Sequence, residues 1–95
     1  MVTAIVHIKA EVDRITEVAE TIAEIDGVSE VYSITGDYDL LAMVRVPVYE
    51  QIAEVVPGRV NKVEGVLHTE THIAFRAYSK HDLDAAFSIG FPEAD

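Results

Sequence analysis

The sequence predicts an α+β domain with the ferredoxin-like element order βαββαβ, in which two helices lie on one face of a four-stranded antiparallel sheet. Three observations support this prediction. Strand-like segments of alternating or continuous apolar residues are separated by two segments of helical periodicity. A short turn at residues 35–39 joins two of the strand segments, and so short a connection forces an antiparallel hairpin. The two halves of the chain also match each other in sequence.

The match between the halves is an internal repeat. A shift of 38 residues without a gap aligns residues 25–28 (Ile-Asp-Gly-Val) with residues 63–66 (Val-Glu-Gly-Val). In each half, a helical segment ends at this corner and a strand segment begins. Few aligned pairs are identical, so chance similarity is the alternative. The matching order of elements favours a duplicated βαβ unit.

The first half begins with a strand at residues 1–10, whose apolar side chains at even positions share one face. A helix follows, with Asp13 expected as its N-cap. Its apolar stripe is Ile15, Val18, Ala19, Ile22, Ala23 and Ile25. Gly27 suits the left-handed conformation that ends a helix. A second strand is expected at residues 28–34, with Val28 and Tyr32 at even spacing.

The second half begins with the apolar strand at residues 40–46, which Pro47 closes. A second helical pattern starts near Val48, and Pro57-Gly58 interrupts it because proline lacks an N–H and clashes with the preceding turn. The last strand is expected at residues 66–78. We therefore predict a ligand-binding αβ-sandwich domain over residues 1–78 and a C-terminal tail over 79–95. The tail is expected to contain a short helix from Asp82 to Phe87.

Composition limits the classes of function. The chain has 7 basic and 17 acidic residues, a formal net charge of −10, and no cysteine. Such an acidic chain is expected to bind nucleic acid poorly, because affinity for nucleic acid depends on neutralising phosphates. No apolar run approaches the roughly 18 residues of a membrane span. A soluble cytoplasmic protein without disulfides is therefore expected, with no direct nucleic-acid or membrane partner.

The sheet face away from the helices is predicted to be half apolar. Ile5, Leu41 and Met43 fall on it, with His7 and Arg45 among them. This is too apolar for a fully solvated face. We expect it to pack against the same face of a second copy, forming an α/β-sandwich dimer. The alternative is a scatter of singly exposed apolar residues.

The chain resembles the effector-binding domain (RAM domain) of the Lrp/AsnC family of transcriptional regulators, over residues 2–78. The residues that carry the resemblance are 25–28 (Ile-Asp-Gly-Val), 35–40 (Thr-Gly-Asp-Tyr-Asp-Leu) and Gly65-Val66 followed by Thr69-Glu70-Thr71. The helix-turn-helix half of such regulators is missing, so DNA binding is not expected to transfer. The chain is similar to the stand-alone versions of the domain.

The resemblance implies a homodimer that assembles further, with an amino-acid effector bound between dimers. Mixed assembly with full-length relatives is a possible mode of action. Carried over residue by residue, the effector site is Gly36, Asp37, Tyr38, Asp39, Thr69 and Thr71. The Pro57-Gly58 break departs from the family pattern and puts the dimer–dimer surface in question.

The chemistry of these residues suits a free amino acid. Asp39 can accept hydrogen bonds from an ammonium group, while threonine hydroxyls and turn N–H groups can donate to a carboxylate. Thr69 and Thr71 are two apart, so they share one face of the last strand. The alternative is that the aspartates stabilise the turn and the threonines are ordinary strand residues.

Other chemistries are less well supported by the sequence. His68 and His72 share a strand face but lie about 13 Å apart, too far for two ligands of one metal ion. No nucleophile motif, phosphate loop or catalytic carboxylate pair is recognisable. We therefore expect no catalytic residue, metal or cofactor. Two alternatives stay open: a small dimeric α/β-barrel enzyme using His7, His68 or Tyr78, and an ACT-like regulatory module.

Overall fold

The computed structural model describes residues 1–78 and residue 80. The expected helix from Asp82 to Phe87, and most of the predicted tail, lie outside the described residues. The main elements are β1 (Val2–Ala10), α1 (Ile15–Ala23), β2 (Val28–Ser33), β3 (Leu40–Val46), α2 (Glu50–Val55) and β4 (Val66–Ala74). Two short 3-10 turns, η1 (Val12–Arg14) and η2 (Val60–Lys62), precede α1 and follow α2.

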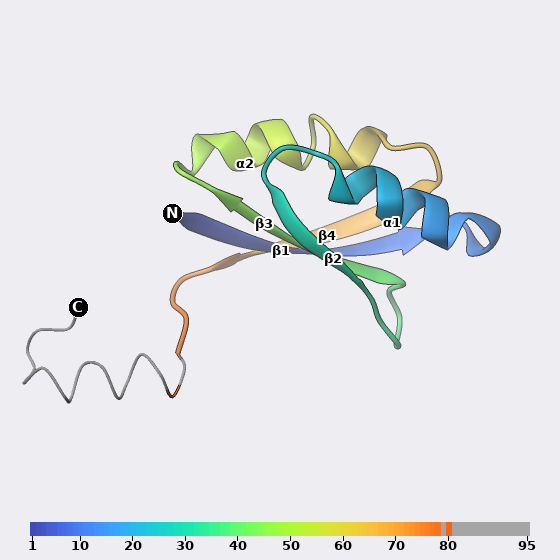
Figure 1. Ribbon diagram of the computed structural model, residues 1–95, viewed down its shortest axis with the longest axis horizontal. Helices are drawn as coiled ribbons and strands as arrows, with labels where there is room; N and C mark the ends of the chain where they lie inside the picture. The colour runs from blue at the N-terminus through green and yellow to red at the C-terminus, as the bar shows by residue number, and fades with distance from the viewer. Residues whose placement is uncertain (79, 81–95) are drawn as a thin grey trace, which may run out of the picture.

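The four strands form one antiparallel sheet in the order β2-β3-β1-β4. Both helices cover the same face, and the other face has no covering element within the described chain (Figure 1). The predicted ferredoxin-like fold is thereby confirmed. β1 and β3 are central, while β2 and β4 form the two edges.

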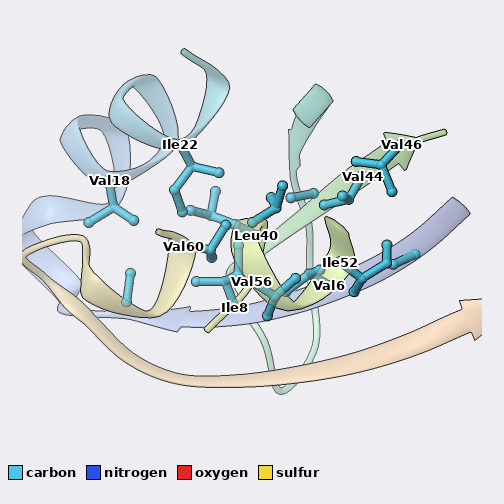
Figure 2. Packing of buried hydrophobic residues seen from close by; sticks show 14 residues of the cluster. Val6, Ile8, Val18, Ile22, Leu40, Val44, Val46, Ile52, Val56 and Val60 are labelled. Carbon is cyan, nitrogen blue, oxygen red and sulfur yellow. The ribbon is translucent and has the colours of Figure 1, made fainter. Parts of the chain in front are cut away.

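The core lies between the sheet and the helices (Figure 2). Burial alternates along β1 as predicted, with Ala4, Val6 and Ile8 fully buried. The largest side chains below 2% exposure are Ile8, Ile22, Leu40, Val6, Val18, Val44 and Val60. Each such aliphatic side chain contributes about 1.5–3 kcal/mol relative to exposure. The core therefore fixes which face of each strand is left for other contacts.

The two corners of the internal repeat have the same backbone structure. The amide of Ile25 donates to the Ile22 carbonyl at 3.0 Å, and the equivalent Val63 amide donates to Val60 at 3.2 Å. The amides that open β2 and β4 donate in the same way, from Val28 at 3.0 Å and from Val66 at 3.1 Å. The corner glycines have φ of 98° and 100°. Shared hydrogen bonds and dihedrals support a duplicated βαβ unit.

The predicted start of the first helix was wrong. Residues 12–14 form η1, α1 begins at Ile15, and no side chain caps either start. The Arg14 amide instead donates to the Glu11 carbonyl at 2.9 Å. A backbone turn thus replaces the side-chain cap expected from Asp13.

Two strand predictions also differ from the structure. The register of β2 shifts between Val28 and Glu30, so Val28 pairs with Val44 toward the core while Tyr32 pairs with Leu41 on the opposite face. The even spacing of Val28 and Tyr32 therefore does not place them together, because the shift changes the alternation. The last strand ends at Ala74 rather than 78, where its pairing with the start of β1 ends.

Glycine at position 65 is expected to be essential for packing. A Cβ there would lie 2.7 Å from Val18 Cγ2, whereas a Cβ on Gly36, which also has positive φ, would meet nothing within 4 Å. Gly65→Ala should therefore cost about 2–4 kcal/mol of unfolding free energy, from backbone strain and overpacking together. Gly36→Ala should cost only the strain, about 1–2 kcal/mol. Urea denaturation of both variants measures the difference, and equal losses would contradict the packing argument.

The uncovered sheet face, called the open face below, carries the half-buried side chains of Ile5, Leu41 and Met43. If a second copy packs against this face, Met43→Asp should weaken self-association strongly, because a buried carboxylate without a partner is costly. Sedimentation analysis measures the effect. Val12→Asp is the matched control, since Val12 is 90% exposed and lies in η1 rather than on a strand of the open face. A monomeric wild-type protein, or equal self-association of Met43→Asp and Val12→Asp, would refute the predicted interface.

Candidate functional site

The turn between β2 and β3 is tied to the end of β1. Within the turn, the Ile34 amide donates to the Asp39 carbonyl at 3.0 Å. The Asp39 amide donates to the Ile8 carbonyl at 2.9 Å. Lys9 Nζ donates to the Asp37 carbonyl at 3.0 Å. One bond thus closes the turn, and two more tie it to β1.

The Asp39 side chain completes this attachment. Its Oδ2 accepts a hydrogen bond from the Ala10 amide at 2.9 Å. The β1–β4 register shifts between Lys9 and Ala10, which disrupts the local ladder, and Ala10 is only 1% exposed. A buried amide left without an acceptor is costly. Asp39 therefore satisfies a backbone group 29 residues away in sequence.

The tip of the turn offers donors. Gly36 has φ of 109°, and Gly36 and Asp37 are exposed. The amides of residues 36–38 donate to no acceptor within the described part of the chain. Successive free amides in a turn form a concave group of donors suited to an anion such as a carboxylate.

Tyr38 points from the turn onto the open face. Its hydroxyl donates to Glu70 Oε1 at 2.8 Å, and Glu70 Oε2 lies 2.8 Å from His72 Nε2. The Tyr38 ring lies 5.5 Å from that of His7 and is stacked on His68 at 6.1 Å. The His7 and His72 rings meet edge to face at 5.7 Å. We call these five residues the histidine cluster.

Hydrogen bonding shifts the ionisation of the two groups at the centre of this cluster. Bonds to Tyr38 and then to His72 hold the pKa of the Glu70 carboxyl below its ordinary value. The bond to Glu70 raises the pKa of the Tyr38 hydroxyl. Glu70 is thus an ionised acceptor at neutral pH, with both oxygens engaged.

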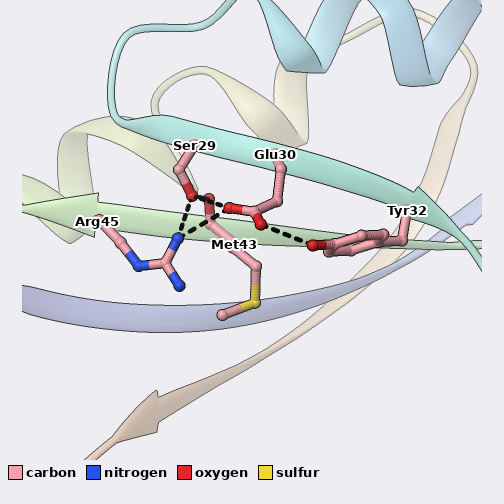
Figure 3. Close-up of polar contacts among 5 residues, drawn as sticks. All are labelled: Ser29, Glu30, Tyr32, Met43 and Arg45. Carbon is pink, nitrogen blue, oxygen red and sulfur yellow. Dashed lines mark hydrogen bonds and ion pairs between the residues drawn. The ribbon is translucent and has the colours of Figure 1, made fainter. Parts of the chain in front are cut away.

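A second polar group lies on the open face over β2 and β3 (Figure 3). Arg45 Nη1 donates to Ser29 Oγ at 2.6 Å and to Glu30 Oε1 at 2.9 Å, and the Tyr32 hydroxyl donates to Glu30 Oε2 at 2.6 Å. The bond from Tyr32, followed by those from Ser29 and Arg45, lowers the pKa of Glu30 to about 2. This group was not predicted from the sequence, although Glu30 and Tyr32, two apart on one strand, were a signal.

The two threonines of the predicted site lie on the helix side of the sheet. Thr69 and Thr71 pair with Ile8 and Val6 of the core face. The Thr69 hydroxyl donates to Asn61 Oδ1 at 2.7 Å. Thr71 lines a cavity of ≈ 510 Å³ between α2 and β4. Its other walls include Tyr49, Ile52, Val56, Pro57 and Ile73.

The six predicted site residues therefore do not converge within one protomer. Residues 36–39 share the turn, but Asp39 and Thr69 flank Ile8 from opposite neighbouring strands. Two strand spacings separate them by about 10 Å. A small amino acid touching both the turn and Thr71 would need them to come from different copies of the chain.

The residues named for other chemistries are arranged as follows. His7 and His68 both contact Tyr38, while Tyr78 is 76% exposed and takes no part in the cluster. Within residues 1–78 and 80, no group of three or more His, Asp or Glu side chains is placed to hold a metal ion. No helix in this part of the chain is long and apolar enough to cross a membrane.

Comparison with known families identifies the domain. The model of the Lrp/AsnC ligand-binding domain matches residues 3–83. The chain belongs to this family. An uncharacterised HTH-type transcriptional regulator of Pyrococcus horikoshii is 42% identical over 59 residues, which are 62% of this chain and 39% of the regulator. The chain thus spans about two fifths of the length of that relative.

Solved structures of similar fold include short and long proteins. A crystal structure of a Thermus thermophilus protein has a TM-score of 0.79 and 46% identity, covering 84% of this chain and 100% of that protein. A Neisseria meningitidis transcriptional regulator in complex with L-Met has a TM-score of 0.73 and 14% identity, over 82% of this chain and 52% of the regulator. The second likeness shows the fold alone.

Removal of the Asp39 carboxylate should destabilise the domain. Asp39→Ala leaves the buried Ala10 amide without its acceptor, which should cost about 1–3 kcal/mol of unfolding free energy. Asp39→Asn keeps an acceptor oxygen, so this variant should lose less unfolding free energy than Asp39→Ala. Chemical denaturation of both variants compares them. Equal stability of Asp39→Ala and wild type would contradict the structural role of this bond.

Proposed function

We propose that this chain is an amino-acid-sensing domain that binds its effector at the β2–β3 turn and responds by changing its assembly. The observation that carries the proposal is the match of residues 3–83 to a ligand-binding domain of transcriptional regulators. The L-Met complex of the Neisseria meningitidis regulator, which has the same fold, supports an amino acid as the class of ligand.

The turn has groups for both ends of a free amino acid. Asp39 uses Oδ2 for the Ala10 amide, and Oδ1 has no partner within the described residues, so it remains available to an ammonium group. The amides of residues 36–38 are available to a carboxylate. A charged acceptor beside a set of free donors complements a zwitterion. Asp39 would then act both in holding the turn and in binding.

A second copy of the chain is proposed to complete the site. Thr71 and the apolar walls of the cavity between α2 and β4 lie on the other side of β1 from the turn. Contributed by a neighbouring copy, they would receive the side chain of the effector. The Thr69 hydroxyl is already bonded to Asn61, which makes Thr71 the better polar contact.

The output of the domain is proposed to be regulatory rather than catalytic. The curated relatives are HTH-type transcriptional regulators, and the chain matches only part of their length. Its net charge of −10 opposes direct contact with DNA. A change of assembly, among copies of this chain or with longer relatives, would transmit the signal.

A thermal-shift screen against the twenty amino acids tests the proposal. At least one should raise the melting temperature, because a ligand that binds only the folded state stabilises it. With the best ligand, Asp39→Asn should lose about 1.5–3 kcal/mol of binding free energy, the scale of a charge-assisted hydrogen bond. No shift with any amino acid would count against amino-acid sensing.

Thr71→Val is an independent test of the shared site, since it removes the hydroxyl and keeps a β-branched residue of similar size. Its affinity for the same ligand should fall while its stability without ligand is retained. Unchanged affinity in both Asp39→Asn and Thr71→Val would mean that the ligand binds elsewhere and that the turn has only a structural role.

A further inference from the structure

The cavity between α2 and β4 has apolar walls that reach the surface of the domain. Its volume of ≈ 510 Å³ is typical of cavities that hold ligands, which measure about 300–1,000 Å³. Glu50 is the one charged residue among the described residues that line it. Tyr49 is 63% exposed, and Ala53 and Pro57 are exposed as well. An open apolar surface of this kind is suited to an apolar occupant.

An uncharged apolar segment follows the domain in the sequence. Residues 85–91 (Ala-Ala-Phe-Ser-Ile-Gly-Phe), called the tail segment below, contain no charged side chain, although charged residues make up 25% of the chain. The tail segment lies outside the described residues and beyond residue 83, where the match to the family model ends. Its composition is unlike that of the polar, highly charged segments that cannot gain stability by burial. The sequence therefore favours docking of these residues on an apolar surface.

The end of β4 lies next to the cavity. Thr71 and Ile73 of this strand line the cavity, and β4 is an edge of the sheet, so no other strand separates the departing chain from it. The eleven residues 75–85 can span about 36 Å when extended, at about 3.3 Å per residue. The chain is thus long enough to turn back around the edge of the sheet and bring the tail segment to the cavity.

Tethering favours the tail segment over a free partner. A segment joined to its site by a short flexible linker has an effective concentration in the millimolar range. A second cavity of ≈ 420 Å³ lies on the open face, but Arg45 and Arg76 line it. Covering two guanidinium groups with uncharged apolar side chains would be costly, because charges are expensive to bury without a partner. The cavity between α2 and β4 is therefore the better match.

We propose that the tail segment docks in the cavity between α2 and β4 of its own chain, with Phe87, Ile89 and Phe91 supplying the buried side chains. The proposed function assigns this cavity to the side chain of the effector, so the tail segment would compete with the effector for it. That competition rests on the proposed function, whereas the docking itself does not. The tail would then be an autoinhibitory element of the domain.

The absence of cysteine from the chain allows a direct test by disulfide formation. Ala53→Cys places a thiol at the cavity, and Ser88→Cys places one in the tail segment without removing a bulky side chain. A disulfide needs Cβ atoms about 3.5–4.5 Å apart. Under mild oxidation, the full-length double variant should form an intramolecular disulfide at least about tenfold faster than the control pair Glu20→Cys and Ser88→Cys, because docking raises the local concentration of the thiols. Non-reducing electrophoresis and mass spectrometry measure the rates.

A further substitution tests the apolar contact. Phe87→Asp, added to the pair Ala53→Cys and Ser88→Cys, should lower the rate to that of the Glu20→Cys control, because a carboxylate without a partner is costly to bury. Ala94→Asp adds the same charge outside the tail segment and should leave the rate unchanged. Circular dichroism checks that every variant is folded.

Four results would overturn the proposal. Equal rates in the Ala53→Cys and Glu20→Cys pairs would exclude docking at this cavity. A faster reaction of Thr3→Cys with Ser88→Cys would place the tail segment in the cavity of the open face, which Thr3 lines. Disulfides formed only between two chains would exclude docking within one chain. An unchanged rate with Phe87→Asp would exclude burial of Phe87.

These measurements contain no amino acid and do not depend on the thermal-shift screen. A screen without a hit would leave the disulfide rates as they are, and slow disulfide formation would leave the thermal shifts as they are. The docking of the tail segment and the sensing of amino acids therefore fail separately.

Discussion

The hydrogen bond from the Ala10 amide to the Asp39 carboxylate holds together the parts of the molecule that the proposed function uses. The register shift at the end of β1 disturbs the ladder next to a buried amide, and the turn between β2 and β3 supplies the acceptor at 2.9 Å. Because Asp39 is held in this way, the preceding residue is also placed, and the Tyr38 side chain reaches Glu70 on the open face. The free amides at the tip of the turn are fixed by the same attachment.

The sequence was sufficient to predict the elements whose signal is local. Alternation along β1, the apolar run of β3 and the glycines at the two repeat corners identified the fold and the core face of these strands. Predictions failed where a non-local contact or a register shift decided the outcome. A backbone turn replaced Asp13 as the helix cap, a shift within β2 separated Val28 from Tyr32, and β4 ended where its partner strand began.

The candidate site shows the same limit. The turn residues were found because a glycine followed closely by two aspartates has a recognisable local chemistry. The partners of that turn were not predicted, since His7 and Glu70 are adjacent only through the β1–β4 register. The bond between Thr69 and Asn61 of η2 was not predicted either. Nor could spacing alone show that Thr69 and Asp39 lie on either side of β1. Only the sheet order places the six residues in two separate groups, which is why a site shared between copies is the interpretation that fits them.

The two faces of the sheet are linked through adjacent residues of one turn. Asp39 belongs to the proposed effector site, while Tyr38 belongs to the open face that is expected to pair with a second copy. An effector that shifts the turn would also shift the Tyr38 hydroxyl and its bond to Glu70. If that shift changes the affinity between copies, thermodynamic linkage requires pairing to change the effector affinity by the same factor. The turn would then be the element that joins the effector site to the open face.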